Sequence, residues 1–347
     1  KIHYMCDIIV RWWDMKKIFD KIKKFFKENY KGILILVFIY LLFNFKLGFS
    51  IYSPGGLINL DNRIESKSDI NKSKGSINMT YVRLVKGTIP TYLLAKVIPT
   101  WDIVDNDDIT YDGDIDETIK IDKYYLLESI SNAYMVAYNS ASVDYSIKKS
   151  NNYVTYIYEK AKTDLKLFDN IIKYDNIKFT TFSEMQEYIT NKNVGDKITF
   201  DVVRNGKNIK CYAELIDLDG KAKVGLTSAV INEYDSDVNV SVKSKASESG
   251  SSGGFMTALA IYNAITKDDI TKGRVIAGTG TIDSEGNVGE IGGVTYKLAG
   301  AYKNGADIML VPKDNYEEAL KYKKKHKLDI ELVSISTFKE GIEYLEN

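Results

Sequence analysis

Residues 278–315 read GTGTIDSEGNVGEIGGVTYKLAGAYKNGADIMLVPKDN, and they set the pattern of the C-terminal part of the chain. Short apolar runs at 275–283 and 306–312 predict buried strands, whereas residues 294–303 have the three- and four-residue apolar spacing of a helix. The alternation extends on both sides, with strands expected at 237–245 and 329–336 and helices at 253–266 and 315–325. Strands that alternate with helices predict an α/β (α+β) domain, to which we assign residues 229–347.

The composition excludes several kinds of site. The 347 residues carry 47 basic and 47 acidic side chains, so no net charge points to nucleic acid. The two cysteines, Cys6 and Cys211, lie on opposite sides of an apolar segment, and we expect no disulfide between them. The sequence contains no Cys/His cluster, no HExxH and no GxxxxGK[ST] loop, so we expect no metal ion, nucleotide or cofactor.

The apolar segment predicts a membrane anchor at residues 33–52. Residues 33–45 are apolar except for Asn44, and Lys46 can reach the headgroups from near a helix end. Tolerating this lysine extends the segment to about the 20 residues that a bilayer requires. The alternatives are a cleaved signal peptide, with Gly48 and Ser50 as small residues near the cut, and a buried core helix.

Seven lysines lie between residues 16 and 31, against two acidic residues. By the positive-inside rule, residues 1–32 form a cytoplasmic tail of a single-pass protein of the cell membrane, and everything after residue 52 is extracellular. Met15 begins a stretch typical of a native start, which makes residues 1–14 a candidate non-native extension.

Residues 53–144 are expected to form an extracellular segment that packs on the C-terminal domain. Its predicted elements are a polar loop or loose strand at 55–76, a strand at 75–88 and helices at 89–99 and 117–140.

The stretch GSSGGFMTALAIYN, residues 250–263, has the residues of an acyl-transfer site. Ser252 before a helix is by itself most simply an N-cap. The glycines at 250, 253 and 254 nevertheless let backbone N–H groups approach a ligand, and the positive end of a helix stabilises an oxyanion. Ser252 is therefore a candidate nucleophile, with the amides around Ser252 and Gly253 as candidate oxyanion donors.

The chain holds two histidines, and neither suits the role of base. His3 precedes the apolar segment and His326 lies in the lysine-rich KYKKKHK, which predicts a solvated face. Lysine is the remaining partner type. Lys297 lies at the edge of a helical stripe formed by Val294, Leu298 and Ala301, so burial would lower its pKa toward about 7 or 8, at a cost of about 4 kcal/mol.

Residues 169–206 resemble part of a PDZ domain. The landmarks are Asp-Asn-Ile-Ile at 169–172 and the strand pair that begins with Gly-Asp-Lys-Ile at 195–198 and ends with Arg-Asn-Gly at 204–206. The resemblance implies a small β-rich domain at residues 145–228 that captures peptides by strand addition. The carboxylate-binding loop of such domains is not recognisable in the sequence, and a purely structural β-module is the alternative.

Two blocks resemble the Lon peptidase family. Residues 250–263 are similar to its nucleophile segment GPSAGxxxALAI, and residues 278–315 to its TGxIxxxGxVxxIGGxxxKxxAAxxxGxxxxxxP block. The resemblance implies that Ser252 is the nucleophile, Lys297 the dyad lysine and Thr279 a hydroxyl that helps to hold this lysine. Ser251 and Gly253 replace the usual Pro and Ala, and Ser249 replaces an acidic residue, so Ser251 remains the second candidate nucleophile.

The whole layout resembles membrane-anchored bacterial Lon-like serine peptidases that have an inserted PDZ domain and lack the AAA+ module. It implies an ATP-independent endopeptidase that cleaves extracellular peptides or proteins presented by the PDZ domain. The altered residues around Ser252 keep an alternative open, a catalytically inactive scaffold that binds envelope proteins. A different Ser-Lys enzyme, such as a signal peptidase or an amidase, is disfavoured by the IGGxxxK block.

Overall fold

The computed structural model describes residues 2–66, 70–111, 114–179, 182–238 and 240–347. The chain divides into two compact units, one made of residues 1–52 and 84–105 and the other of residues 53–83 and 106–347. Strands β1 (Phe49–Asn59) and β3 (Ser76–Lys86) contribute to both units, and they are neighbours in one sheet. Residues 84–105 of the segment 53–144 belong to the first unit, and its other residues belong to the second.

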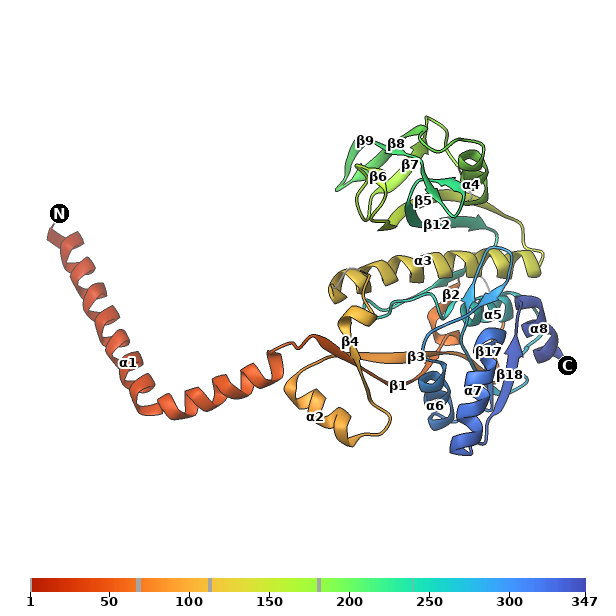
Figure 1. Cartoon of the computed structure of the whole chain (residues 1–347). Helices are drawn as coiled ribbons and strands as arrows, with labels where there is room; N and C mark the ends of the chain where they lie inside the picture. The colour runs from red at the N-terminus through yellow and green to blue at the C-terminus, as the bar shows by residue number, and fades with distance from the viewer. Residues whose placement is uncertain (1, 67–69, 112–113, 180–181, 239) are drawn as a thin grey trace. The chain divides into compact units, whose positions relative to one another are not determined.

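The first unit contains two helices and a short antiparallel ribbon. Helices α1 (Ile2–Asn44) and α2 (Ile89–Val97) are labelled in Figure 1, and β4 (Asp102–Asp105) pairs with residues 49–52 of β1. Helix α2 begins where predicted because Thr88 and Thr91 form a reciprocal capping box and Pro90 occupies the first turn.

The helix that carries the apolar segment ends earlier than predicted. Helix α1 ends at Asn44, and residues 49–52 lie in β1 rather than in a helix. In the described part of the chain, no helix combines the length and the apolar character needed to span a membrane.

The second unit is built on a largely parallel sheet. Strands β3, β14 (Val275–Gly278), β17 (Ile308–Pro312) and β18 (Glu331–Ile335) run parallel in this order, and β1 lies on the other side of β3. Ile276, Ile308 and Leu310 pack on one face of the sheet, whereas Ala277, Met309 and Val311 pack on the other. Because alternate residues enter two cores, these strands read as continuous apolar runs in the sequence.

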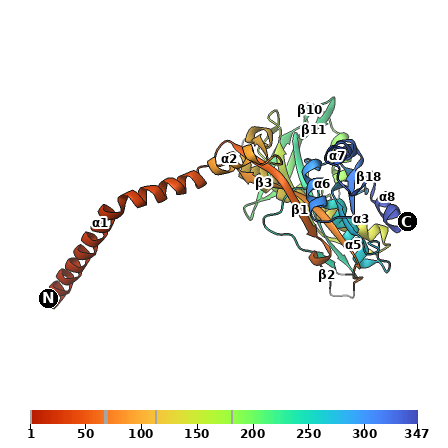
Figure 2. The ribbon, with the colours of Figure 1, turned by 90° about the horizontal axis from the view of Figure 1, so that it is seen from below.

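Helices cover both faces of this sheet (Figures 1 and 2). One core includes residues of α3 (Ile115–Ser140), α5 (Gly254–Ile265) and α8 (Phe338–Glu346), and the other includes residues of α6 (Val294–Lys303) and α7 (Lys313–His326). The predicted strand-helix alternation is confirmed, with 275–283 divided into β14 and β15 (Thr281–Ile282), and β15 pairs with β16 (Val288–Gly289).

Part of the segment 55–76, which was expected to be a loop or loose strand, forms strands, since residues 55–59 lie in β1 and residues 64–66 form a short strand of their own. Ile51 of β1 is fully buried, and β2 (Ile64–Ser66) pairs with β13 (Val240–Val242). Short 3-10 turns cover Asp61–Arg63 and Asn106–Asp108. The polar residues of this segment hid the strand pattern in the sequence. One of them, Asp61, has a structural role, because its carboxylate accepts hydrogen bonds from Ser73 Oγ and from the N–H of Ile77.

A β-rich domain lies within the second unit. Its sheet has the order β12-β5-β7-β8-β9-β6. The elements are β5 (Tyr145–Ile157), β6 (Lys162–Thr163), β7 (Asn170–Tyr174), α4 (Phe182–Thr190), β8 (Lys197–Arg204), β9 (Lys207–Glu214) and β12 (Leu226–Ser236). A two-strand ribbon of β10 (Ile216–Leu218) and β11 (Lys221–Lys223) precedes β12.

The two landmarks that suggested this domain have structural roles. Asn205 and Gly206, at φ of 51° and 74°, make the tight turn between β8 and β9. Asp169 is fully buried and accepts hydrogen bonds from Arg204 Nε at 2.7 Å and Nη2 at 2.6 Å. The predicted boundary at residue 228 falls inside β12, which pairs with β5 as far as Ser236.

We predict that Arg204→Met destabilises this domain by about 3–5 kcal/mol, because it leaves the Asp169 carboxylate buried and unpaired. Lys162→Met is the matched control, since its ion pair with Glu214 lies at the surface and contributes little. Hydrogen exchange of the β7 and β8 amides should accelerate strongly in Arg204→Met alone. Equal exchange rates in the two variants would contradict a structural role of the buried pair.

Candidate active site

The loop before α5 holds the two candidate nucleophiles. Helix α5 begins at Gly254, its N-cap is Gly253, and no side chain caps it. Ser252 therefore does not have the ordinary capping role that its position suggested. Both Ser251 and Ser252 are partly exposed, whereas Gly253 and Gly254 are buried.

The glycines of this loop are required by close packing. A Cβ atom at Gly253 would lie 2.6 Å from Met79 Sδ, and one at Gly254 would lie 2.1 Å from Ser129 Oγ. Met79 on β3 thus occupies the space beside residue 253, where an alanine was expected from the resemblance. The loop is packed against neighbouring elements on both sides rather than being a loose hinge.

Lys297 is buried on α6, as the helical stripe predicted. Its side chain is 3% exposed, and its Nζ donates a hydrogen bond to Thr279 Oγ1 at 3.1 Å. Burial lowers the pKa of the Lys297 amine from its usual 10.5 to about 7. The amine is therefore neutral in a large fraction of molecules near neutral pH, which is the state that a general base requires.

Thr279 joins the lysine to the loop. It follows β14, is fully buried, and its N–H donates to the carbonyl of Leu310 on β17. Its hydroxyl accepts from Lys297 Nζ and donates to the carbonyl of Ser252 at 3.0 Å. One hydroxyl therefore fixes the positions of the amine and of the main chain at Ser252.

Sequence analysis missed Ser129 and Met79. Ser129 Oγ donates to the carbonyl of Ser251 at 2.8 Å, although the two residues are 122 positions apart. The sequence contained one indication that Ser129 is buried, because it lies on the same face of the predicted helix as the apolar residues Leu126 and Ala133.

A groove of 870 Å³ passes beside the loop. Its lining includes Ser251, β15 with the residues that follow it as far as 285, and the α3 residues Glu128 and Ser129. Glu128 Oε1 accepts from the N–H of Val230 on β12 at 2.7 Å. Burial raises the pKa of Glu128 to about 7, although this hydrogen bond opposes the shift.

Comparison with known proteins identifies two kinds of domain in the chain. Residues 220–345 match the model of the Lon protease (S16) C-terminal proteolytic domain, and residues 148–215 match that of the PDZ domain. The C-terminal part of the chain is a Lon-type proteolytic domain. A PDZ domain precedes it.

Curated relatives support the Lon-type domain. The Lon protease of Campylobacter jejuni is 36% identical over 136 residues, which cover 38% of this chain and 17% of the relative. Lon protease 2 of Bacillus subtilis is 32% identical over 110 residues, 31% of this chain and 19% of the relative. The chain therefore spans less than a fifth of the length of these two relatives.

Two solved structures of PDZ domains are similar to part of this chain. The PDZ domain of the SdrC-like protein of Listeria monocytogenes is 24% identical and covers 24% of this chain and 92% of that chain, with a TM-score of 0.23. The corresponding domain of Listeria innocua is 27% identical and covers 22% of this chain and 92% of that chain, with a TM-score of 0.22.

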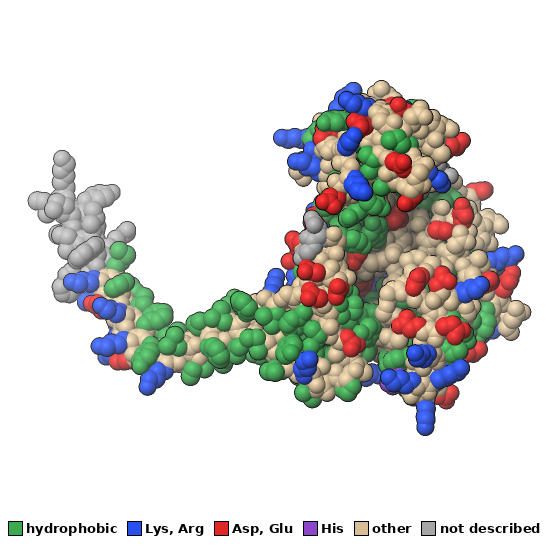
Figure 3. Space-filling view, viewed as in Figure 1, with side chains coloured by type: hydrophobic (Ala, Val, Ile, Leu, Met, Phe, Trp, Pro, Cys, Tyr) green, Lys and Arg blue, Asp and Glu red, His purple; other side chains and the backbone are tan. Residues whose placement is uncertain are grey.

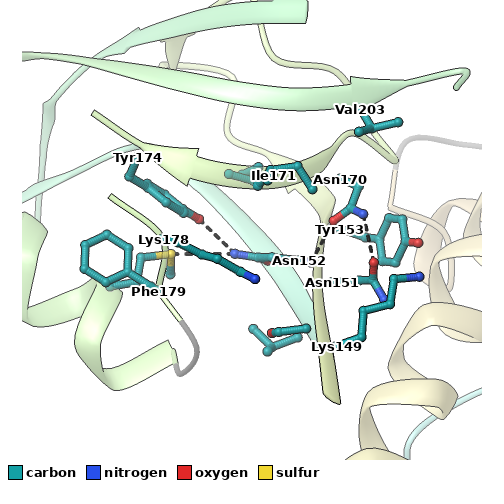
Figure 4. A pocket seen from close by; sticks show the side chains of 14 residues that line it. Lys149, Asn151, Asn152, Tyr153, Asn170, Ile171, Tyr174, Lys178, Phe179 and Val203 are labelled. Carbon is teal, nitrogen blue, oxygen red and sulfur yellow. Dashed lines mark hydrogen bonds between the residues drawn. The ribbon is translucent and has the colours of Figure 1, made fainter. Parts of the chain in front are cut away.

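The PDZ domain has two cavities beside α4. One, of 430 Å³, has Asn152 on its floor, where Nδ2 donates to the Tyr174 hydroxyl at 2.8 Å, and Lys178 and Phe179 lie nearby (Figure 4). The Oδ1 atom of Asn152 is buried and accepts no hydrogen bond in the described part of the chain. The other cavity, of 290 Å³, lies between α4 and the start of β12.

The remaining chemistry of the described residues is limited. No group of three or more His, Cys, Asp or Glu side chains there could hold a metal ion. Cys211 is buried with a free thiol. The ring of His326 on α7 packs against Tyr322, with ring centroids 4.2 Å apart, and the residue is exposed. The side chain of His3 lies outside the described residues.

We predict that Lys297→Met stabilises the protein, by up to about 4 kcal/mol at pH 6. Between pH 7 and 10.5 the unfolded chain binds more protons at Lys297 than the folded chain does, so the stability of the wild type rises with pH. The gain from Lys297→Met should therefore be largest below pH 7 and vanish near pH 10.5. Urea unfolding at pH 6 and pH 10 measures it, with the exposed Lys303→Met on the same helix as control.

An equal gain at both pH values, or the same behaviour in Lys303→Met, would show that the Lys297 amine is not desolvated in the folded protein.

Proposed function

We propose that this chain is a serine endopeptidase in which Ser252 and Lys297 form the catalytic dyad. The observation that carries the proposal is a buried lysine amine with a pKa near 7, joined through the Thr279 hydroxyl to the carbonyl of Ser252. The Lon-type domain match gives this geometry its chemical context.

The reaction has two steps. The neutral Lys297 amine takes the proton of Ser252 as Oγ attacks the scissile carbonyl, and the resulting ammonium returns a proton to the leaving amine as the peptide bond breaks. Lys297 then deprotonates the water that attacks the acyl-enzyme ester, and the proton passes back to Ser252 Oγ as the acid product leaves. Each step leaves the dyad in its starting protonation state.

The backbone provides a site for the oxyanion. In the described part of the chain, the N–H groups of Ser252 and Gly253 donate to no protein atom. They lie at the N-terminal end of α5, where the helix dipole favours negative charge. Two adjacent free donors beside a serine are the arrangement that stabilises a tetrahedral intermediate.

The PDZ domain is proposed to capture a peptide and present it to the protease. The 290 Å³ cavity is lined by Met185 and Ile189 of α4 and by Val224 and Leu226 at the start of β12. Gly225, at φ of 79°, turns the chain between these two apolar residues. An extended peptide added along β12 would place an apolar side chain in this cavity.

Farther along β12, N–H groups at the edge of the strand already donate hydrogen bonds to side chains of α3. The N–H of Val230 is bonded to Glu128 and the N–H of Asn232 to Ser131 Oγ at 2.9 Å. We therefore assign peptide capture to the beginning of β12. Ser228 lines both the 290 Å³ cavity and the groove beside Ser251. A peptide held at the beginning of β12 would therefore lie next to the groove that passes beside the nucleophile loop.

We further propose that α1 attaches the chain to the cell membrane and that the protease faces outward. Apolar side chains cover the C-terminal part of α1 (Figure 3), and the following are each more than half exposed: Leu34, Ile35, Leu36, Phe38, Leu41 and Phe43. Such a surface is unfavourable in water, and the preceding lysines suit the cytoplasmic headgroups. ATP independence is part of the same proposal, supported by the lack of a GxxxxGK[ST] loop in the sequence.

We predict that Ser252→Ala and Lys297→Ala each lower peptidase activity by about 1,000-fold or more, because nucleophile and base act as a unit. Ser251→Ala should keep most of the activity. Cleavage of labelled β-casein without and with ATP measures the rates, and mass spectrometry of the fluorophosphonate adduct identifies the modified serine.

Full activity in Ser252→Ala, or an adduct on Ser251, would refute this dyad. A wild-type chain that neither cleaves nor reacts with fluorophosphonate but binds peptides would support the inactive scaffold instead. A requirement for ATP would contradict the proposed independence.

For the membrane, we predict that Leu36→Gln, Phe38→Gln and Leu41→Gln together move the chain from the carbonate-resistant membrane pellet to the supernatant. The control is Tyr212→Gln with Tyr302→Gln, which alters exposed apolar side chains outside α1. Retention of the triple variant in the pellet would argue against anchoring by α1. Surface biotinylation of intact cells tests the outward orientation.

A further inference from the structure

The two candidate oxyanion donors belong to two successive peptide planes. The Ser252 N–H lies in the plane that carries the Ser251 carbonyl, and the Gly253 N–H lies in the plane that carries the Ser252 carbonyl. Because a trans peptide is planar, its N–H and C=O point in opposite directions. A hydrogen bond that fixes the direction of the carbonyl therefore also fixes the direction of the N–H in the same plane.

The second plane is held by groups of the Lon-type motif. The Ser252 carbonyl accepts from Gly280 N–H at 2.8 Å and from Thr279 Oγ1 at 3.0 Å. These two bonds aim the Gly253 N–H, so Thr279 orients an oxyanion donor as well as Lys297.

The first plane is held from α3. The Ser251 carbonyl accepts from Gly254 N–H at 3.1 Å and from Ser129 Oγ at 2.8 Å. Ser129 is 3% exposed, and the space that its hydroxyl fills is open because Gly254 has no side chain. Ser129 is thus built into the packing of the loop.

Helix α3 also holds the loop through its main chain. The N–H of Gly250 donates to the carbonyl of Asp122 at 2.9 Å, and Gly250 has a φ of 87°. The Ser129 hydroxyl binds the residue directly before the nucleophile, and this residue is a serine rather than the expected, conformationally restricted proline. A side chain of α3 therefore restrains the main chain at a residue where proline would have fixed φ.

We propose that Ser129 is a positioning residue of the protease, which fixes the plane between Ser251 and Ser252 so that the Ser252 N–H points at the developing oxyanion. This proposal rests on the proposed peptidase function. Without the Ser129 hydroxyl, the Ser251 carbonyl keeps one hydrogen bond of two, and the plane can rotate. Loss of a complete oxyanion donor costs about 100- to 1,000-fold in kcat, so a misaimed donor should cost about 10- to 100-fold.

Ser131→Ala is a matched control for Ser129→Ala. Both serines are buried on α3, at 2% and 3% exposed, and both hydroxyls bond to the main chain of another element. Ser131 binds Asn232 of the PDZ strand β12, whereas Ser129 binds the nucleophile loop. Both variants remove a buried hydroxyl from α3. Ser129→Ala releases the nucleophile loop, whereas Ser131→Ala releases the PDZ strand β12.

The experiment uses the full chain with labelled β-casein as substrate. We expect Ser129→Ala to lower kcat and the rate of fluorophosphonate labelling by about 10- to 100-fold, with KM within about 2-fold of the wild type, because the oxyanion forms only in the transition state. Ser131→Ala should leave kcat within about 3-fold. Both variants should have similar thermal midpoints.

An unchanged kcat in Ser129→Ala, or an equal loss in Ser131→Ala, would overturn the positioning role. Hydrogen exchange of residues 249–254 tests it without any activity and should accelerate in Ser129→Ala alone. If the wild type proves inactive, the proposed function fails. In that case, unchanged hydrogen exchange of residues 249–254 in Ser129→Ala would also refute the proposal that Ser129 fixes the peptide plane between Ser251 and Ser252.

Discussion

A lysine amine that is 3% exposed has lost most of its hydration, and in this protein the Thr279 hydroxyl replaces part of it. Burial disfavours the charged form, whose three N–H donors would need more acceptors than one hydroxyl supplies, so the neutral form is favoured and the pKa of Lys297 falls to about 7. The sheet supports this arrangement, because the Thr279 N–H is bonded to Leu310 at the centre of the fold. The position of Thr279, and with it the pKa of Lys297, thus depends on where the parallel strands β14 and β17 end.

The nucleophile loop is restrained by elements that are distant in the sequence. Thr279 and Gly280 bind the Ser252 carbonyl, Ser129 binds the Ser251 carbonyl, and Asp122 binds Gly250. Small residues make these contacts feasible, since a side chain at 253 or 254 would meet Met79 or Ser129. The loop departs from the Lon pattern at three positions, yet the surrounding structure restrains it closely.

Local pattern predicted the features that depend on helical or strand periodicity. The burial of Lys297 follows from its place beside Val294, Leu298 and Ala301, and the sheet strands follow from their continuous apolar runs. Ser129 could be given no role, because its contact with the loop spans 122 positions. The helix that carries the apolar segment was predicted to extend too far, since hydropathy does not reveal that residues 49–52 pair with residues 102–105.

Strand β12 belongs to two packing environments at once. It pairs with β5 along the PDZ sheet from Leu226 to Ser236, and its other edge is bonded to Glu128 and Ser131 of α3. Melting this strand would break hydrogen bonds on both sides together, so the PDZ and Lon-type domains should lose structure as one cooperative block rather than as independent modules. A chain cut at the apparent domain boundary would leave each half with an unsatisfied strand edge, which is a route to aggregation.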